Sequence, residues 1–182
     1  LSALHSRYEF VQRDRVMAEL YPKLMDLAQM AKAQDIGLCV DAEEADRLDI
    51  SMDVIKAASG DASLKGWDGF GLAVQAYQKR AAPLIDWLED VAGRTNRRLM
   101  VRLVKGAYWD TEVKRAQEMG EDGYPVFTPA ERAAFLDSYL PPFRPDPHGG
   151  HVAWLWARVR DQFTVFPWNL WGAAARRRPA AS

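Results

Sequence analysis

Apolar residues up to about residue 128 follow two alternating patterns, one typical of amphipathic helices and one typical of buried strands. Within residues 9–34, helical spacing places five apolar residues on one face: Met17, Leu20, Leu24, Leu27 and Ala31. Pro22 falls inside this pattern, so we expect a kink or a late start of the helix. Further helices are predicted over residues 42–58, 79–93 and 108–119. The inward face of the helix at 79–93 is formed by Leu84, Ile85, Leu88 and Val91.

Short apolar runs separate the predicted helices, at residues 36–42, 70–75 and 98–104. They alternate too little for half-exposed strands, and such runs suit parallel strands buried on both faces. The opening residues 1–5 read like the end of a further strand. The regular order of strand and helix predicts βα units around a parallel sheet, which both a doubly wound sheet and a (β/α)8 barrel contain.

Polar side chains at the ends of these strands favour the barrel. Asp41 ends the first strand, Gln75 ends the second, and Arg102 and Lys105 lie at the end of the third. Barrel enzymes build their active sites at the C-terminal ends of the strands, so we expect Asp41, Gln75 and Arg102 to converge there. No glycine-rich phosphate fingerprint of the doubly wound type follows any strand. We therefore predict an α/β fold that forms a partial TIM-like (β/α)8 barrel, about the first half of the complete barrel.

The character of the sequence changes after Thr128. Most of the prolines fall in residues 129–182, where they interrupt regular structure, and no strand–helix rhythm continues. We expect residues 1–128 to form the first half of the barrel, and residues 129–182 to be an irregular or mobile tail of unrelated sequence that adds no barrel strand. A frameshift or a gene-prediction error would account for such a tail.

Composition and charge give no reason to expect a nucleic-acid-binding, disulfide-bonded or membrane-spanning protein. The 182 residues carry a net charge of -1, which gives no reason to expect a nucleic-acid partner. Cys39 is the single cysteine, so no intrachain disulfide is possible and a reducing compartment is the simpler assumption. We expect Cys39 to be a small core residue and not a redox centre. The sequence contains no long uninterrupted apolar stretch, so we expect no membrane span. His148 and His151 flank two glycines, but two histidines without further ligands predict no metal site.

Three runs resemble signatures of the proline dehydrogenase family: residues 40–47, 74–80 and 102–110. With the opening residues 1–5, they match in order and spacing the proline dehydrogenase domain of bacterial bifunctional proline utilisation proteins. The resemblance covers the chain from Leu1 to about Thr128. It implies a distorted (β/α)8 barrel holding FAD, which oxidises L-proline to 1-pyrroline-5-carboxylate in proline catabolism to glutamate.

The resemblance also implies roles for the residues at the strand ends. Arg102 resembles the residue that contacts the flavin near N5; its alternative is a strand-end ion pair. Gln75 resembles the residue that hydrogen-bonds the flavin pyrimidine edge; its alternative is a satisfied strand-end amide. Asp41 resembles a carboxylate beneath the flavin that orders the substrate pocket, and it also suits the N-cap of a helix starting at Ala42.

The loop after the third strand carries the remaining candidates. Lys105, Gly106 and Ala107 resemble the loop that lies along the cofactor. Tyr108 resembles a residue against which the proline ring packs, and Trp109 either packs on the cofactor or belongs to the core. Catalytic roles are thus expected for Asp41, Arg102 and Tyr108. The acidic residues after the first strand read instead as a solvated helix face: Glu43, Glu44 and Asp46.

The chain departs from the family pattern in two respects. The later barrel strands have no counterpart, and nothing around residues 176–178 matches the family helix whose arginines bind the substrate carboxylate. We therefore expect a fragment with little or no activity; the alternatives are a non-catalytic remnant and a barrel enzyme of unrelated chemistry. For intact relatives, the resemblance implies quinone as electron acceptor, a cytoplasmic location with peripheral attachment to the inner membrane, and oligomers. We expect no DNA binding in this segment.

Overall fold

The computed structural model describes residues 1–128, 131 and 164–165. Four strands form its sheet: β1 (Leu38–Val40), β2 (Phe70–Gln75), β3 (Met100–Val104) and β4 (Thr164–Val165). The helices are α1 (Arg13–Ala33), α2 (Leu48–Gly60), α3 (Ala81–Thr95) and α4 (Trp109–Met119). Short 3-10 helices add η1 (Ser2–Leu4), η2 (Phe10–Gln12), η3 (Ala45–Arg47) and η4 (Ala62–Leu64).

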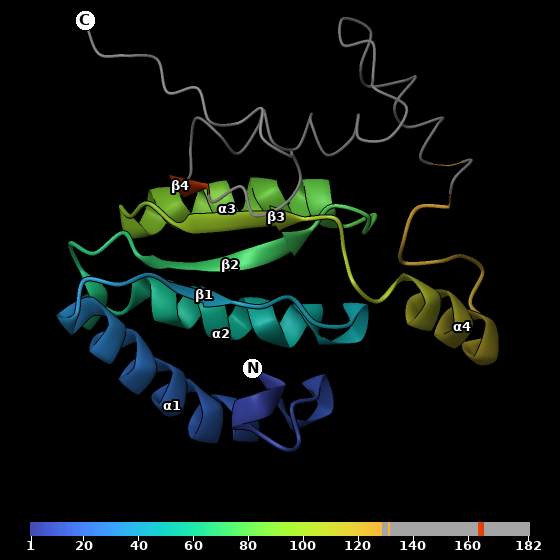
Figure 1. Ribbon diagram of the computed structural model, residues 1–182. Helices are drawn as coiled ribbons and strands as arrows, with labels where there is room; N and C mark the ends of the chain where they lie inside the picture. The colour runs from blue at the N-terminus through green and yellow to red at the C-terminus, as the bar shows by residue number, and fades with distance from the viewer. Residues whose placement is uncertain (129–130, 132–163, 166–182) are drawn as a thin grey trace, which may run out of the picture.

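The sheet is parallel throughout, in the order β1-β2-β3-β4 (Figure 1). The prediction that residues 36–42, 70–75 and 98–104 form adjacent parallel strands is confirmed. Gly71 of β2 lies so close to the Met100 backbone that any Cβ there would overlap the Met100 carbonyl oxygen. Glycine is therefore needed where β2 and β3 approach each other.

The expectation that residues 129–182 add no strand is wrong at one place. Thr164 and Val165 pair in parallel with Met100 and Val101, and so extend the sheet beyond β3. A parallel pair requires a crossover connection, since the two strands must run in the same direction. The segment that supplies β4 therefore contributes backbone hydrogen bonds to the sheet.

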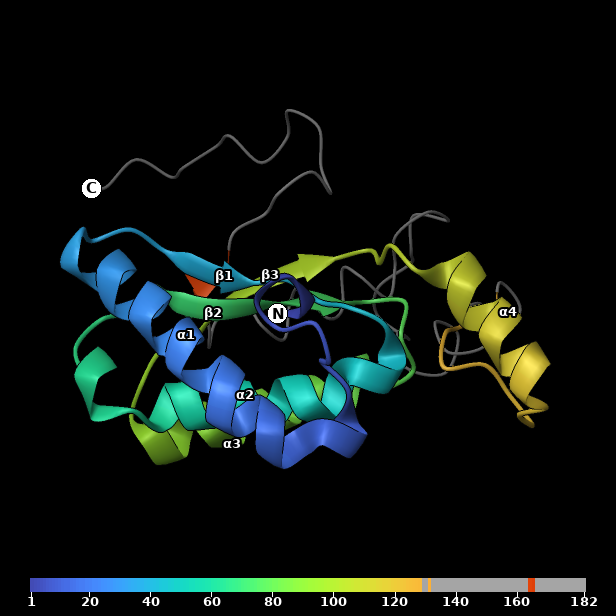
Figure 2. The same cartoon turned by 90° about the horizontal axis from the view of Figure 1, so that it is seen from below.

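Helices α1, α2 and α3 lie together on one face of the sheet (Figure 2). Their buried apolar side chains pack against those of the strands to form the core, which includes Val16, Leu20, Leu24, Ile50, Val54, Phe70, Leu72, Ile85, Leu88, Val101 and Leu103. The four inward residues predicted for α3 are all buried. Helix α4 instead lies beyond the carboxyl ends of the strands, away from this layer (Figures 1 and 2).

Several local expectations were wrong. Residues 1–5 contain the 3-10 helix η1 and not the end of a strand. Helix α1 starts at Arg13, well before Pro22, so no late start occurs. Leu27 is 40% exposed, because Val16, Met25 and Ala28 complete the buried face of α1 in its place.

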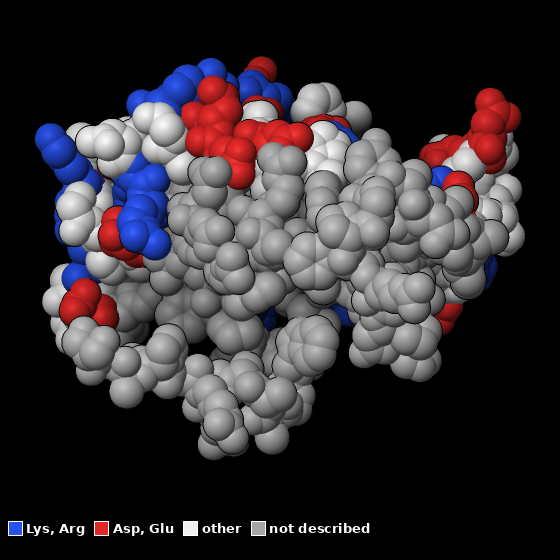
Figure 3. Space-filling model, turned by 90° about the horizontal axis from the view of Figure 1, so that it is seen from above, with Lys and Arg blue, Asp and Glu red and all other residues white. Residues whose placement is uncertain are grey.

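The surface carries charges of both signs. On the face seen in Figure 3, the described acidic and basic side chains lie in small mixed groups. None of the helices in the described part of the chain is long and apolar enough to cross a membrane.

Candidate functional site

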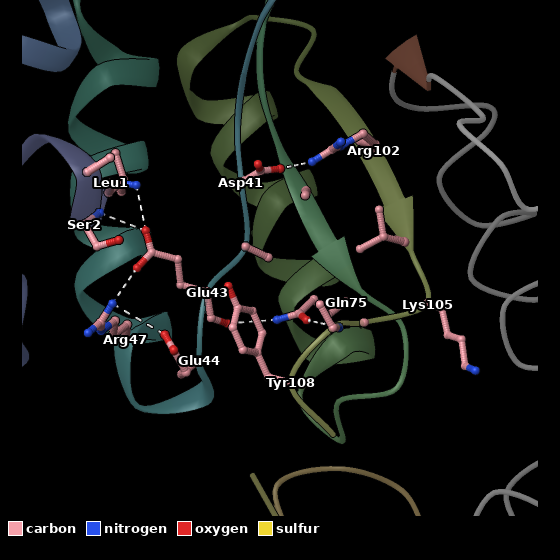
Figure 4. A pocket seen from close by; sticks show the side chains of 16 residues that line it. Leu1, Ser2, Asp41, Glu43, Glu44, Arg47, Gln75, Arg102, Lys105 and Tyr108 are labelled. Atoms are coloured by element: carbon pink, nitrogen blue, oxygen red, sulfur yellow. Dashed lines mark hydrogen bonds and ion pairs between the residues drawn. The ribbon is translucent and has the colours of Figure 1, made fainter. Parts of the chain in front are cut away.

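A pocket of ≈ 590 Å³ opens at the carboxyl ends of β1, β2 and β3 (Figure 4). Side chains from the ends of all three strands line it, together with η1, the segment after β1 and the loop after β3. The lining includes seven of the eight predicted site residues: Asp41, Gln75, Arg102, Lys105, Gly106, Ala107 and Tyr108. The predicted convergence of Asp41, Gln75 and Arg102 at one end of the sheet is confirmed.

Arg102 and Asp41 form an ion pair across the sheet. Arg102 is paired with Ala73 of β2 in the strand register, so its side chain emerges on the pocket side of the sheet. Its Nε is buried and has no hydrogen-bond partner among the described residues. A buried donor without a partner costs free energy, which a bound acceptor at this nitrogen would recover.

Asp41 does not cap a helix, although its sequence position suggested that role. Helix α2 begins only at Leu48, and the residue before η3 is Glu44. The carboxylate of Asp41 is mostly exposed and is held by Arg102 instead. Residues 41–44 belong to no helix or strand, and the chain enters η3 only at Ala45.

Gln75 is the polar residue at the end of β2, and it is 3% exposed. Its Nε2 donates to the Glu43 carbonyl oxygen at 2.8 Å, and its Oε1 accepts from the Ala107 N–H at 3.1 Å. Both halves of the amide therefore bind backbone, as in the strand-end alternative. Each still has capacity for one further bond, since an amide offers two donors and two lone pairs.

The loop after β3 is shaped by Gly106. Its φ of +128° suits glycine, and the Tyr77 ring occupies the place that a Cβ would take. The Tyr77 hydroxyl accepts from the Tyr108 N–H at 3.1 Å, which fixes the next turn of the loop. Lys105 is exposed and its side chain points away from the other labelled residues (Figure 4).

Tyr108 reaches into the pocket toward the segment that carries Glu43 (Figure 4). Burial raises the pKa of its phenol, and the nearby Glu44 and Glu43 carboxylates raise it further, against a smaller lowering by Arg47. The neutral phenol is therefore favoured, and it can both donate and accept a hydrogen bond.

Trp109 is the predicted site residue that the pocket does not include. Trp109 is 40% exposed, and its Nε1 donates to the Phe127 carbonyl oxygen at 3.3 Å. It therefore faces the segment that returns after α4 and is not buried in the core, which was one of the two places expected from the sequence, while its contact with a cofactor stays a prediction.

Glu43 was expected on a solvated helix face, and this is wrong. Its side chain is only 10% exposed and lines the pocket. Burial alone would raise the pKa of Glu43, but bonds from the Leu1 amino group, the Ser2 N–H and Arg47 outweigh it and bring the pKa to about 2. Its position two residues after a strand-end aspartate is the signal that could have identified it.

A second acidic residue, Glu112 of α4, was missed altogether. It is buried, and its Oε1 accepts from the Ala45 N–H at 2.6 Å. No sequence signal distinguishes it from the other charged residues of this helix. His148, His151 and the arginines at residues 176–178 lie outside the described residues.

Comparisons with known proteins agree with this geometry. The sequence model of the family described as proline dehydrogenase matches residues 2–134. Over 141 residues the chain is 57% identical to the bifunctional protein PutA of Salmonella typhimurium and 55% identical to that of Escherichia coli. These matches cover 77% of this chain and 10% of either relative, so the chain spans a tenth of their length.

Solved structures give the same result. A mutant of proline utilization A from Bradyrhizobium japonicum matches 75% of this chain and 15% of its own, with a TM-score of 0.69 and 61% identity. A proline utilization A structure with proline bound in remote sites covers 90% of this chain and 18% of its own, with a TM-score of 0.72 and 52% identity. The partial barrel expected from the sequence is thus supported by neighbours of the same architecture. The chain belongs to the proline dehydrogenase family.

Proposed function

We propose that this chain supplies the early-strand part of an FAD-dependent proline dehydrogenase site, which oxidises L-proline to 1-pyrroline-5-carboxylate in proline catabolism. The observation that carries the proposal is the convergence of Asp41, Gln75 and Arg102 on one pocket at the carboxyl ends of three parallel strands. Membership of the family implies a flavin, and ligands of barrel enzymes bind at this edge of the sheet.

The donors of the pocket fit a flavin. Arg102 brings a positive charge held by Asp41 and a buried Nε that has no partner among the residues that the structure describes. When bound, the flavin accepts the hydride from the proline carbon next to nitrogen and gains negative charge in its ring. A preorganised cation beside that ring stabilises such charge without reorganising during the reaction. We therefore assign Arg102 to this place, with Asp41 holding its guanidinium in position.

Gln75, the loop of Lys105 to Ala107 and Tyr108 complete the proposed site. Gln75 presents its remaining donor and acceptor capacity to the flavin pyrimidine edge, while its other bonds hold the loop. Tyr108 offers a neutral ring against which the proline ring packs. The loop backbone would hold the cofactor along its length, in a shape that Gly106 permits through its close approach to the Tyr77 ring.

We expect residues 1–182 to have little or no proline dehydrogenase activity. In the described part of the chain, Arg102 is paired with Asp41 and Arg47 with Glu43, so neither cation is free to bind the proline carboxylate in two-point fashion. A substrate displaced by about 1 Å can lose roughly a hundredfold in rate. Proline-dependent reduction of a dye acceptor measures this, and turnover near that of an intact relative contradicts it.

Flavin binding by residues 1–182 tests the proposal directly. We expect titrated FAD to bind, and Arg102→Met to weaken binding about tenfold, since a bond to a charged group contributes about 1.5–3 kcal/mol. Arg80→Met is the matched control, because Arg80 pairs with Asp49 at the surface and does not line the pocket. Equal affinities for both variants, or a folded chain that binds no FAD, contradict the proposal and favour a non-catalytic remnant.

The same resemblance supports three wider proposals about the intact protein. We propose that a membrane quinone takes the electrons from the flavin, that the protein works in the cytoplasm at the inner membrane surface, and that it forms oligomers. Vesicles that contain quinone should then accelerate reoxidation of the proline-reduced protein relative to vesicles without it.

A further inference from the structure

Glu112 is the most buried carboxylate among the described residues, with 4% of its surface exposed. It lies one turn after Tyr108, and its own N–H donates to the Tyr108 carbonyl oxygen at 2.9 Å. Its side chain reaches out of α4 to accept from the Ala45 N–H at 2.6 Å. A short bond from a backbone N–H to a carboxylate belongs to the stronger class of hydrogen bonds.

A second contact joins the same two segments. Arg115, three residues after Glu112 and hence on the same face of α4, pairs with Asp46 at 2.6 Å. Apart from Glu112, the one residue that α4 buries is Ala116. Among the described residues little apolar surface of α4 is buried, so the two polar contacts with residues 45–46 help to orient it, together with the bond from Trp109 to Phe127.

The Glu112 bond closes a loop of contacts around Tyr108. Gln75 binds the Glu43 carbonyl on one side and the Ala107 N–H on the other, which ties the segment after β1 to the loop after β3. Glu112 ties the same two segments a second time, beyond Tyr108. Tyr108 therefore lies between these two connections, while its own N–H is held by Tyr77, and all three bonds contribute to the shape of the pocket on its side.

We propose that Glu112 is a positioning residue that holds Tyr108 against the segment 43–45 and so sets the shape of the proline side of the pocket. An apolar residue of similar size would anchor a helix at least as well, because a buried carboxylate must be desolvated. A carboxylate specifies one partner and one geometry, which a positioning role requires. The consequence for proline rests on the proposed function, but the positioning itself does not.

The chemistry of Glu112 identifies the conservative replacement. Burial raises its pKa, while the Ala45 N–H lowers it, Asp46 raises it and Arg115 lowers it. An oxygen of either the charged or the neutral carboxyl accepts from Ala45. Glu112→Gln keeps that acceptor, whereas Glu112→Ala removes it. Glu118→Ala is the control, since Glu118 is an exposed residue of the same helix.

Two readouts in residues 1–182 test the proposal without flavin. In Glu112→Ala, we expect the Ala45 amide to exchange about tenfold faster, since loss of a bond to a charged group costs at least about 1.5 kcal/mol. We also expect the Tyr108 pKa, followed by 13C NMR of labelled tyrosine, to fall toward its ordinary value as the ring becomes less buried and moves away from Glu44 and Glu43. Glu112→Gln should restore both readouts, and Glu118→Ala should change neither.

A third readout connects the positioning to function. If the chain binds FAD, Glu112→Ala should weaken binding of proline about tenfold and change FAD affinity less than about threefold. A chain that binds no FAD overturns the proposed function, and the Ala45 and Tyr108 readouts still decide the positioning. Should Glu112→Ala fail to fold, Glu112→Asp shortens the acceptor by one methylene and gives the same readouts. Unchanged Ala45 exchange and Tyr108 pKa in a folded variant, or no rescue by glutamine, overturn the proposal.

Discussion

Helices α3 and α4 each follow a strand of the same sheet, yet they bury different kinds of side chain. Helix α3 buries Leu84, Ile85, Leu88 and Val91 against the core. Helix α4 buries Glu112 and Ala116, and it lies beyond the carboxyl ends of the strands. Apolar burial is non-directional, whereas hydrogen bonds to charged groups fix partner and angle.

This difference separates the part of the molecule that makes the fold stable from the part that shapes the pocket. Substitutions in α3 should change the free energy of unfolding and leave the chemistry of a correctly folded pocket alone. Substitutions at the strand ends and around α4 should disturb the pocket with a smaller effect on stability. Substitutions in the two regions test this division between stability and pocket shape, and the largest effect on stability comes first.

The largest effect is expected for Leu88→Ala in α3. Leu88 is fully buried, and removal of its side chain should lower the free energy of unfolding by about 3 kcal/mol, through lost burial and the cavity left behind. Met119→Ala, at an exposed apolar residue of α4, should change it by less than about 0.5 kcal/mol. Urea denaturation followed by circular dichroism compares the two, and similar losses in both variants would remove the distinction between the helices.

A smaller effect is expected for Gln75→Leu at the end of β2. Leucine fills a similar volume but leaves the Glu43 carbonyl and the Ala107 N–H without their partner, so we expect a loss of about 2 kcal/mol in unfolding free energy. Gln117→Leu is the control, because the Gln117 side chain makes an exposed bond to Tyr124 and does not line the pocket. If Gln75→Leu also frees the loop, the Ala107 amide should lose protection in hydrogen exchange. An unaffected Ala107 amide would mean that Gln75 does not hold the loop.

The sequence predicted those parts of the fold that depend on local periodicity. Continuous apolar runs located β1, β2 and β3, and three- and four-residue spacing located the buried face of α3. Parallel strands share one carboxyl edge, so the meeting of Asp41 with Arg102 followed from strand positions alone.

The parts that could not be predicted depend on contacts between distant residues. Glu112 and Ala45 are separated by 67 positions, and nothing in the local pattern of α4 indicates that this glutamate is buried. Helical spacing in residues 108–119 predicted a helix, but it could not place that helix beyond the sheet. Glu43 reads as solvated because its partners Leu1 and Ser2 lie 42 and 41 positions away in the sequence. Trp109 turns toward Phe127 because the chain after α4 folds back, which its own neighbours in sequence do not reveal.

The smallest effect on stability is expected where that returning segment meets the loop after β2. Glu131 accepts from Lys79 Nζ at 2.6 Å and from the Thr128 N–H at 2.9 Å. The Lys79 bond lowers the pKa of Glu131 most, the Thr128 bonds add to it, and the pKa falls from 4.5 to about 2. Because the folded pKa is depressed, the stabilising contribution is present above about pH 4.5 and is lost as the pH falls toward 2.

Replacement of Lys79 tests this assignment. Lys79→Met removes the largest cause, so the Glu131 pKa should rise toward 4.5 while the Thr128 bonds keep it somewhat below that value. Carboxyl 13C NMR from about pH 6 to about pH 2 follows the titration, and this range includes both the ordinary and the lowered pKa of Glu131. Lys114→Met is the control, because Lys114 pairs with Glu118 on α4 and does not contact Glu131. Since Glu131 is exposed, its bonds guide the returning segment and add little to global stability. A Glu131 that titrates at its ordinary value with Lys79 present would contradict the assignment, and the returning segment would then be held on the loop after β2 by its backbone bonds from Lys79 to Pro125 and from Phe127 to Tyr77.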